Sequence, residues 1–404
     1  MPSKAVQRGT DTMNRSFIAR NPSVLVFLGL LALFTIGVTL LSEGVGTGLI
    51  STSFIKTLGK ILTLCLAAVA MDLIWGYCGI LSLGHFAFFG LGGYMIGMWL
   101  MFERTRQIVV SSLSDSILPP TPEDIQAAIA NQIFGVVGSK DFPLIWAFAD
   151  SLIAQLAFVV LVPGLLALMF GWLAFRSRVT GVYLSILTQA MTLGLSLYLF
   201  QNASGLRGNN GLSGLQNLPG VTASQSVVSL WFFWASALAL GLGYLLVAWV
   251  VSGKFGSVIR GIRDNEARVR FLGYSVESYK LTVFTLTACI SGIAGALYYP
   301  QAGIINPAEV APIASVYLAV WVAIGGRGRL YGAVIGTAFV SLLSSWLTGG
   351  QAPDITLGAY TLKWVDWWLI LLGLSFVLVT LYAPRGMGGL VDLITRRKNT
   401  GADT

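Results

Sequence analysis

Ten apolar segments follow one another along this 404-residue chain, and they constrain its fold more than any other feature. An α-helix needs about 20 mostly apolar residues to cross the hydrocarbon core of a bilayer. Only helices and closed barrels satisfy their backbone hydrogen bonds in lipid, and the short alternating segments of a barrel are absent from the sequence. The pattern predicts an all-α polytopic integral membrane protein with about ten transmembrane helices. The predicted segments are 24–41, 58–75, 85–101, 144–175, 179–200, 227–251, 281–299, 313–324, 331–347 and 367–382.

The composition supports this class and excludes others. Hydrophobic residues make up 55% of the chain and charged residues 10%, whereas soluble domains carry about 25% charged residues. An ordinary soluble enzyme, a disordered protein and a nucleic-acid-binding protein are therefore excluded. The net charge of +8 reports the orientation of the chain in the membrane instead of an anionic ligand, because lysine and arginine concentrate in cytoplasmic loops.

The basic residues predict which loops face the cytoplasm. With the N-terminus inside, 18 of the 25 lysine and arginine residues fall in inner loops and tails, and 7 fall outside. We predict cytoplasmic tails at 1–23 and 384–404 and a transmembrane domain at 24–383. Within that domain we predict outer loops at 102–143 and 201–226 and an inner loop at 252–280. A cleaved signal peptide is the alternative for the first segment, but the length of the segment favours an uncleaved helix.

A glycine-rich run interrupts the second and third apolar segments. Each glycine costs a helix about 1 kcal/mol relative to alanine, so we predict a broken or re-entrant segment near 76–84. Backbone freed at membrane depth must lie against protein or a water-filled cavity, which makes this run the candidate lining of a transport pathway. The alternative is that its later glycines only allow close helix packing. The candidate pathway residues are Asp72, Trp75, Tyr77, Ser82, His85 and Tyr94.

Two of these candidates also have a structural interpretation. Asp72 is the acidic residue placed well inside a predicted span, and a buried ionisable residue in lipid is by default a functional hypothesis. Its plainer role is to cap or hydrogen-bond the broken segment beside Trp75 and Tyr77. His85, the single histidine of the chain, either pairs with Asp72 or lies at a helix start.

The loop at 252–280 is the longest predicted inner loop and carries mixed charge. Val258, Ile259 and Ile262 fall at helical spacing within it. A short amphipathic helix with both signs of charge suits docking into a protein groove, whereas a helix lying on anionic lipid is more often purely basic on its polar face. The candidate docking residues are Gly256, Arg260, Arg263, Asp264, Asn265, Glu266, Arg268, Phe271 and Gly273.

The sequence lacks the residue patterns that metal binding or ATP hydrolysis needs. The three cysteines have no metal-ligand spacing, and the Gly-Lys pairs at 59–60 and 253–254 are followed by Ile61 and Phe255, not by the Ser or Thr of a phosphate-binding loop. The chain is therefore predicted to be no enzyme, to hold no metal and no cofactor, and to hydrolyse no ATP by that route. In the run at 325–336, Gly332 and Gly336 form a small-xxx-small helix-packing pair.

Together, the runs at 72–94, 256–273, 325–336 and 384–390 resemble the membrane permeases of branched-chain amino acid ABC importers. Within that family, Trp75-Gly76-Tyr77 and Ser82-Leu83-Gly84-His85 look most like the urea permease branch. The resemblance covers most of 60–390.

This resemblance implies a multi-subunit machine in the plasma (inner) membrane of a prokaryote. It implies a heterodimer with a second permease, two cytoplasmic ABC ATPases that bind the ATP and Mg²⁺, and an extracytoplasmic substrate-binding protein. The coupling element then maps to 256–273 and the pathway to 75–94. The implied substrate is urea or a related small amide, with hydroxyls of Tyr77, Ser82 and Tyr94 as hydrogen-bond partners; branched-chain amino acids are the alternative.

Three other function classes remain to be compared. An ion-coupled secondary transporter usually needs ionisable groups within its spans, and Asp72 is the one strong candidate. A passive channel has no use for the docking loop at 252–280. A membrane enzyme needs His, Cys or carboxylate clusters at the membrane surface, and the sequence offers none.

Overall fold

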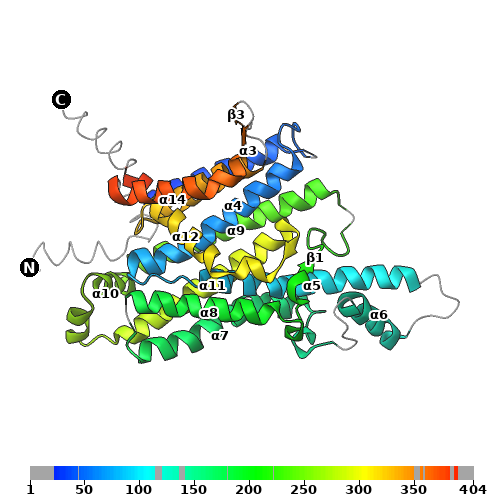
Figure 1. Cartoon of the computed structure of the whole chain (residues 1–404), viewed down its shortest axis with the longest axis horizontal. Helices are drawn as coiled ribbons and strands as arrows, with labels where there is room; N and C mark the ends of the chain where they lie inside the picture. Colours follow the sequence, from blue (N-terminus) through cyan, green and yellow to red (C-terminus); the bar gives the residue numbers. More distant parts are fainter. Residues whose placement is uncertain are drawn as a thin grey trace, which may run out of the picture.

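The structure, a computed structural model, describes residues 22–43, 45–113, 121–135, 142–179, 181–221, 223–349, 355–357, 360–382 and 386–389. These residues form an elongated helical bundle, in which α7, α8 and much of α5 run roughly along the long axis (Figure 1). Helix α10 lies at one end of the bundle and α6 at the other, and we call these the α10 end and the α6 end.

The described elements follow the chain in this order. They are α3 Pro22–Leu41, α4 Thr52–Asp72, the π-helical turn η1 Leu73–Tyr77, α5 His85–Leu113, α6 Pro122–Phe134, η3 Leu144–Trp146, α7 Leu152–Arg176, α8 Val182–Phe200, η4 Asn202–Ser204, η5 Gly208–Asn210, β1 Leu212–Ser213, α9 Gln225–Ser252, α10 Lys254–Phe271, α11 Val276–Ala302, β2 Ile304–Ile305, η6 Pro307–Val310, α12 Pro312–Gly325, α13 Leu330–Thr348, β3 Ile355–Leu357, β4 Tyr360–Leu362 and α14 Trp364–Tyr382.

A helix lies at each of the ten predicted apolar segments, so the predicted class, an all-α polytopic membrane protein, is confirmed. Eight helices in the described part of the chain are long and apolar enough to cross a membrane. Helix α12 and the Trp364–Val379 part of α14 are shorter apolar helices. The number of ten crossings therefore stays a prediction.

The α6 end differs from the predicted loop at 102–143. Helix α5 continues to Leu113, past the predicted end at residue 101, and α6 packs against it. Helix α6 begins at a capping box in which the Thr121 hydroxyl and the Asp124 carboxylate each accept from the other residue's backbone N–H. Phe134 packs edge-on against the Trp146 ring. The described part of 102–143 is therefore a packed helical lobe and not an open connector.

Helix α7 begins later than predicted. The apolar run from residue 144 opens with the 3₁₀ turn η3, and the α-helix starts after Ser151, whose hydroxyl accepts from the Ala154 N–H. The buried Trp146 explains the difference, because its indole N–H donates to the Gly205 carbonyl at 2.7 Å and thereby holds η3 against the loop after α8.

Close helix contacts at glycines build the centre of the bundle, where α4 and α5 are almost wholly buried. Gly92 of α5 lies against the Gly292 carbonyl of α11, and a Cβ at either position would overlap backbone. Gly332 and Gly336 likewise approach Gly325, which confirms the packing interpretation of that pair. Such contacts let α5, α11, α12 and α13 pack at short range.

Candidate functional site

The second and third spans are broken as predicted near 76–84. After the α-helical part of α4 the chain makes the π turn η1, leaves helical structure at 78–84 and resumes as α5 at His85. Gly79 adopts φ of +80°, a conformation that glycine takes without strain. The structure thus confirms the interruption that the glycine-rich run predicted.

Side chains of α8 satisfy the backbone that the break sets free. The Ser185 hydroxyl donates to the Leu81 carbonyl at 2.6 Å, and the Thr188 hydroxyl accepts from the Leu83 N–H at 3.0 Å. Both donors and acceptors at membrane depth need such partners, because no water is available in lipid. The non-helical segment therefore runs beside α8 inside the bundle.

Two helices begin in this interior region. The Phe86 N–H, in the first turn of α5, donates to the Ser315 hydroxyl in the first turn of α12 at 3.0 Å. The N-terminus of a helix carries partial positive charge from its unpaired N–H groups. In secondary transporters, discontinuous helices whose N-termini point into the membrane interior bind anionic groups of the solute. This arrangement makes the α5–α12 junction a candidate part of the pathway.

The structure does not bring the six predicted pathway residues together. Asp72, Ser82, His85 and Tyr94 are fully buried, and Trp75 and Tyr77 are half-buried. They fall into three groups: Asp72, Trp75 and Tyr77 near the α10 end, Ser82 and His85 at the start of α5, and Tyr94 farther along α5. Their role in a pathway stays a prediction.

Asp72 holds a neighbouring turn. Its Oδ1 accepts from the Gly328 N–H at 2.6 Å, in the connection between α12 and α13. A Cβ at Gly76 would overlap both the Asp72 carboxylate and the Gly328 backbone, so glycine permits this close approach. The Arg327 guanidinium lies 5.4 Å from the centre of the Trp75 ring in the same region. Asp72 therefore caps the turn after α12 through a contact distant in sequence.

Arg263 joins the predicted docking loop to the broken segment. Its Nη1 donates to the Gly76 carbonyl at 2.8 Å, and its Nε lies 2.9 Å from the Asp264 Oδ1. Because Gly76 lies in η1, this bond links α10 directly to the chain between α4 and α5.

Helix α10 consists of two parts that meet at a kink. Asn265 has φ of −159° and ψ of 93°, and its side chain accepts from the Arg268 N–H at 3.0 Å, as an N-cap would. Before the kink, Ile259 and Ile262 are buried against the bundle. Gly256 lies against the Val251 carbonyl, which leaves no room for a side chain. The predicted amphipathic helix is thus present, with a second short helix after it.

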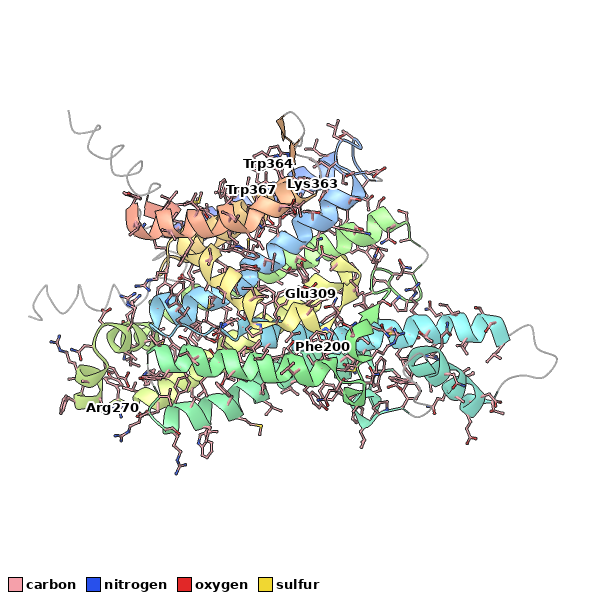
Figure 2. All side chains as sticks on the ribbon, viewed as in Figure 1. Phe200, Arg270, Glu309, Lys363, Trp364 and Trp367 are labelled. Carbon is pink, nitrogen blue, oxygen red and sulfur yellow. The ribbon has the colours of Figure 1, made fainter. Side chains whose placement is uncertain are left out.

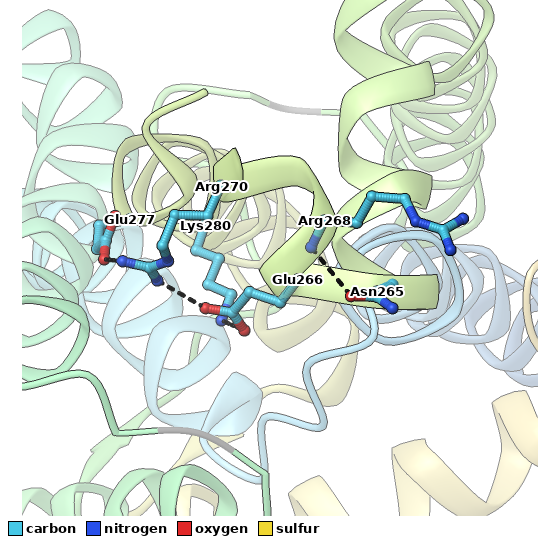
Figure 3. Close-up of polar contacts among 6 residues, drawn as sticks. All are labelled: Asn265, Glu266, Arg268, Arg270, Glu277 and Lys280. Atoms are coloured by element: carbon cyan, nitrogen blue, oxygen red, sulfur yellow. Dashed lines mark hydrogen bonds and ion pairs between the residues drawn. The ribbon is translucent and has the colours of Figure 1, made fainter. Parts of the chain in front are cut away.

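A charged network fixes the second part of α10 (Figure 3). Arg270 contacts Glu266 at 3.0 Å and Glu277 at 2.6 Å, and the Lys280 ammonium contacts Glu266 at 2.6 Å. Glu277 and Lys280 were not among the predicted docking residues, because they follow the glycine that ends the helix. Their pairing across that glycine is a tertiary contact that local spacing does not reveal.

Beyond the network, α10 presents apolar surface. The Phe271 side chain is 93% exposed and Leu272 is 71% exposed. A shallow pocket of about 480 Å³ beside them is lined by Glu266, Ala267, Arg270 and Phe271. Exposed apolar side chains inside a polar rim are typical of a protein-docking surface. The α10 surface, Glu266–Leu272, has that character. Of the other predicted docking residues, Arg268 is exposed and Arg260 is half-buried.

Comparison with known proteins gives a family match over most of the chain. The family described as "branched-chain amino acid transport system / permease component" matches residues 53–380. The high-affinity branched-chain amino acid transport system permease protein LivM of Escherichia coli K12 is 25% identical over 247 residues, which are 56% of this chain and 55% of that protein. LivM of Salmonella typhimurium LT2 is 25% identical over 232 residues, 52% of this chain and 51% of that protein.

A further relative, whose name gives another substrate, matches a shorter part of the chain. The autoinducer 2 import system permease protein LsrC of Shigella flexneri is 29% identical over 113 residues, 26% of this chain and 33% of that protein. The chain thus spans about half the length of the LivM proteins that it matches. No solved structure matches the chain.

Proposed function

The chain belongs to the family of permease components of branched-chain amino acid transport systems, and from this premise we propose that it is the membrane subunit of an ATP-driven importer. The proposed complex contains a second permease, two ABC ATPases and an extracytoplasmic binding protein. The ATP and Mg²⁺ bind to the ATPases. The α10 end faces the cytoplasm, in keeping with the excess of lysine and arginine predicted on that side.

The bond between Arg263 and Gly76 is the observation that supports this proposal most directly. An ATPase docked on the α10 surface moves α10, and Arg263 transmits the movement to η1 and the non-helical segment at 78–84. That segment leads to the α5–α12 junction, where the Phe86 N–H meets Ser315. A docking surface is in this way connected to a candidate pathway by contacts that the structure describes.

Branched-chain amino acids are the better supported substrate. The family description and the names of the LivM relatives give that substrate. Urea is the second candidate, and the motifs at 75–77 and 82–85 favour it; both lie in or beside the broken segment. Both solutes are small and carry no net charge, so a pathway of mostly apolar residues with few polar groups suits either.

Reconstitution tests the proposal. The chain alone in proteoliposomes is expected to show no ATP-driven uptake, and addition of the second permease, both ATPases and the binding protein is expected to establish it. Parallel measurements with radiolabelled leucine and urea decide between the substrates. Concentrative uptake by the chain alone on a proton or sodium gradient would refute the proposal in favour of a secondary transporter.

A further inference from the structure

A pocket of about 290 Å³ lies where α5, the loop after β1 and the first turn of α9 meet. Its polar lining residues are Arg104 and Gln107 on α5, Asn217 in the loop and Gln225, the first residue of α9. Apolar residues, among them the buried Val228 of α9, complete its wall. The lining thus combines one cationic residue with three amide residues.

The pocket and α10 lie at opposite ends of α9. Helix α9 has 28 residues, begins at the pocket with Gln225 and ends at Ser252, two residues before α10 begins. A helix of that length spans about 42 Å, which exceeds the thickness of the hydrocarbon core, about 30 Å. Figure 2 shows Arg270 of α10 well away along the long axis from Phe200, the last residue of α8, after which the chain leads to β1. With the α10 end in the cytoplasm, the pocket lies on the outer side.

A backbone contact holds Arg104 at the pocket. Its Nη1 donates to the Gly214 carbonyl at 3.0 Å, in the loop after β1. Gly214 has φ of +77°, and a Cβ there would overlap the guanidinium, so glycine permits the contact. Because the contact already orders the arginine side chain, a molecule that binds to it meets a smaller cost in side-chain entropy.

The charge of Arg104 is not neutralised by a carboxylate. Among the residues that the structure describes, no carboxylate lies within 4.0 Å of this guanidinium, and the Gly214 carbonyl is its one hydrogen-bond partner. Arg106 on the same helix does form an ion pair, with Glu103 at 3.1 Å. A guanidinium carries five N–H donors in a planar fork that matches a carboxylate. Arg104 therefore retains donors for an anionic group that enters the pocket.

Lys56 adds positive charge beside the pocket. Its ammonium donates to the Gln216 Oε1 at 3.3 Å, and the Gln225 amide donates to the Gln216 carbonyl at 3.5 Å. Within the described part of the chain, Lys56 likewise has no carboxylate within 4.0 Å. Two basic side chains on one face without acidic partners favour an acidic binding partner, since complementary charge steers association and fixes its register.

The pocket is remote from the candidate pathway. Phe86, at the α5–α12 junction, lies 18 residues before Arg104 on α5, which is about 27 Å along a helix. The exposed residues Gln107, Asn217 and Gln225 open the pocket to the surface of the protein. This position favours the side chain of a docked protein over a solute in transit.

We propose that this pocket receives an aspartate or glutamate side chain of the extracytoplasmic binding protein when that protein docks. The carboxylate accepts from the free N–H groups of Arg104, and the amides of Asn217 and Gln225 are further donors at the rim. An arginine set in a pocket and ringed by neutral groups has the character of an interface residue that contributes much of the binding energy. The inference rests on the proposed function, because the binding protein belongs to the proposed complex.

The test measures the Kd of the binding protein for the complete membrane complex in nanodiscs, at low and at high salt. Arg104→Met is compared with Arg106→Met, which removes the same charge from an exposed position on the same helix. We expect the Kd to rise about tenfold in Arg104→Met, with a weaker salt dependence, and to stay near wild type in Arg106→Met. Equal Kd values for the two variants overturn the proposal.

A second pair of variants keeps the bond between Arg104 and Gly214. Asn217→Asp places a carboxylate at the pocket, where it competes with the incoming one, and Asn131→Asp on α6 makes the same charge change elsewhere. If Arg104→Met fails to assemble with the ATPases, this pair decides. We expect about tenfold weaker binding in Asn217→Asp alone, and equal Kd values in both overturn the proposal.

Two further outcomes have distinct meanings. A loss of leucine uptake in Arg104→Met with an unchanged Kd for the binding protein assigns the pocket to the solute carboxylate and overturns the proposal. A wild-type complex that does not bind the binding protein refutes the proposed function itself, whereas binding that is equal in wild type and all four variants overturns the pocket inference alone.

Discussion

The Arg263 guanidinium donates to the Gly76 carbonyl at 2.8 Å, so that the docking helix holds the break between α4 and α5. The two residues lie 187 positions apart in the sequence. Gly79 lies against the aliphatic part of the same arginine, which extends the contact along the segment. This junction gives a mechanical path between a surface that an ATPase would contact and the interior of the bundle.

Replacement of Arg263 by methionine is expected to uncouple the complex. Methionine keeps much of the apolar contact with Gly79 but cannot donate to Gly76, and a lost bond of about 1 kcal/mol corresponds to roughly a fivefold effect. We expect transport per ATP hydrolysed to fall about fivefold while the ATPases still co-purify. Arg263→Lys, which retains a donor, is the matched variant and is expected to recover part of the coupling. Equal coupling in wild type and Arg263→Met would remove this bond from the mechanism.

Phe271 is expected to hold the ATPase to the α10 surface. Burying an exposed aromatic side chain at an interface contributes about 2 kcal/mol, so Phe271→Ser is expected to weaken co-purification of the ATPases more than tenfold. Leu144→Ser is the matched control, because Leu144 is 94% exposed and Phe271 is 93% exposed, and Leu144 lies in η3, outside the α10 surface. Charge reversal by Arg268→Glu is expected to act in the same direction. ATPase recovery that is equal for Phe271→Ser and Leu144→Ser would exclude the α10 surface as the interface.

Local patterns in the sequence predict the helices, the break and the α10 helix, because each depends on residues close together in the chain. Hydrophobic length places the ten helices, and clustered glycines place the non-helical segment at 78–84. The extension of α5 to Leu113 was not predicted, because its polar residues read as a loop until α6 packs on it. The partners of Asp72 and Arg263 were not predicted either, since both contacts join distant parts of the chain.

The candidate site could likewise be predicted only in part from local patterns in the sequence. Glycine content and membrane burial point to 72–94, but the sequence cannot tell which polar residues there are buried for packing and which meet a solute. The structure buries Ser82, His85 and Tyr94 fully, which both roles allow.

The capping box of α6 is expected to depend on pH. Hydrogen bonds from Thr121 hold the pKa of the Asp124 carboxyl below its usual value. A carboxyl group whose pKa is lower in the folded state stabilises that state above the unfolded pKa, and the contribution is lost as the pH falls through the folded pKa. We expect backbone amides in the first turn of α6 to be better protected against hydrogen exchange at pH 7 than at a pH below the folded-state pKa of Asp124. The comparison uses exchange rates corrected for the intrinsic pH dependence of amide exchange. Asp124→Ala is expected to abolish that difference, and an unchanged pH profile in this variant would contradict the role of the cap.

Asp72 is expected to contribute stability through its carbonyl-like oxygen and not through its charge. In Asp72→Asn the side-chain oxygen can still accept from the Gly328 N–H, whereas Asp72→Ala leaves that buried donor without a partner, at a cost of about 1 to 3 kcal/mol. We therefore expect Asp72→Asn to melt near wild type and Asp72→Ala to melt at clearly lower temperature, measured on the purified complex in detergent. Ser82→Ala is the control, because the Ser82 hydroxyl has no hydrogen-bond partner among the described residues.

Transport by Asp72→Asn separates the structural interpretation of Asp72 from the functional one. Near-normal uptake supports the structural role, and loss of uptake in a stable Asp72→Asn complex shows that the charge itself is required.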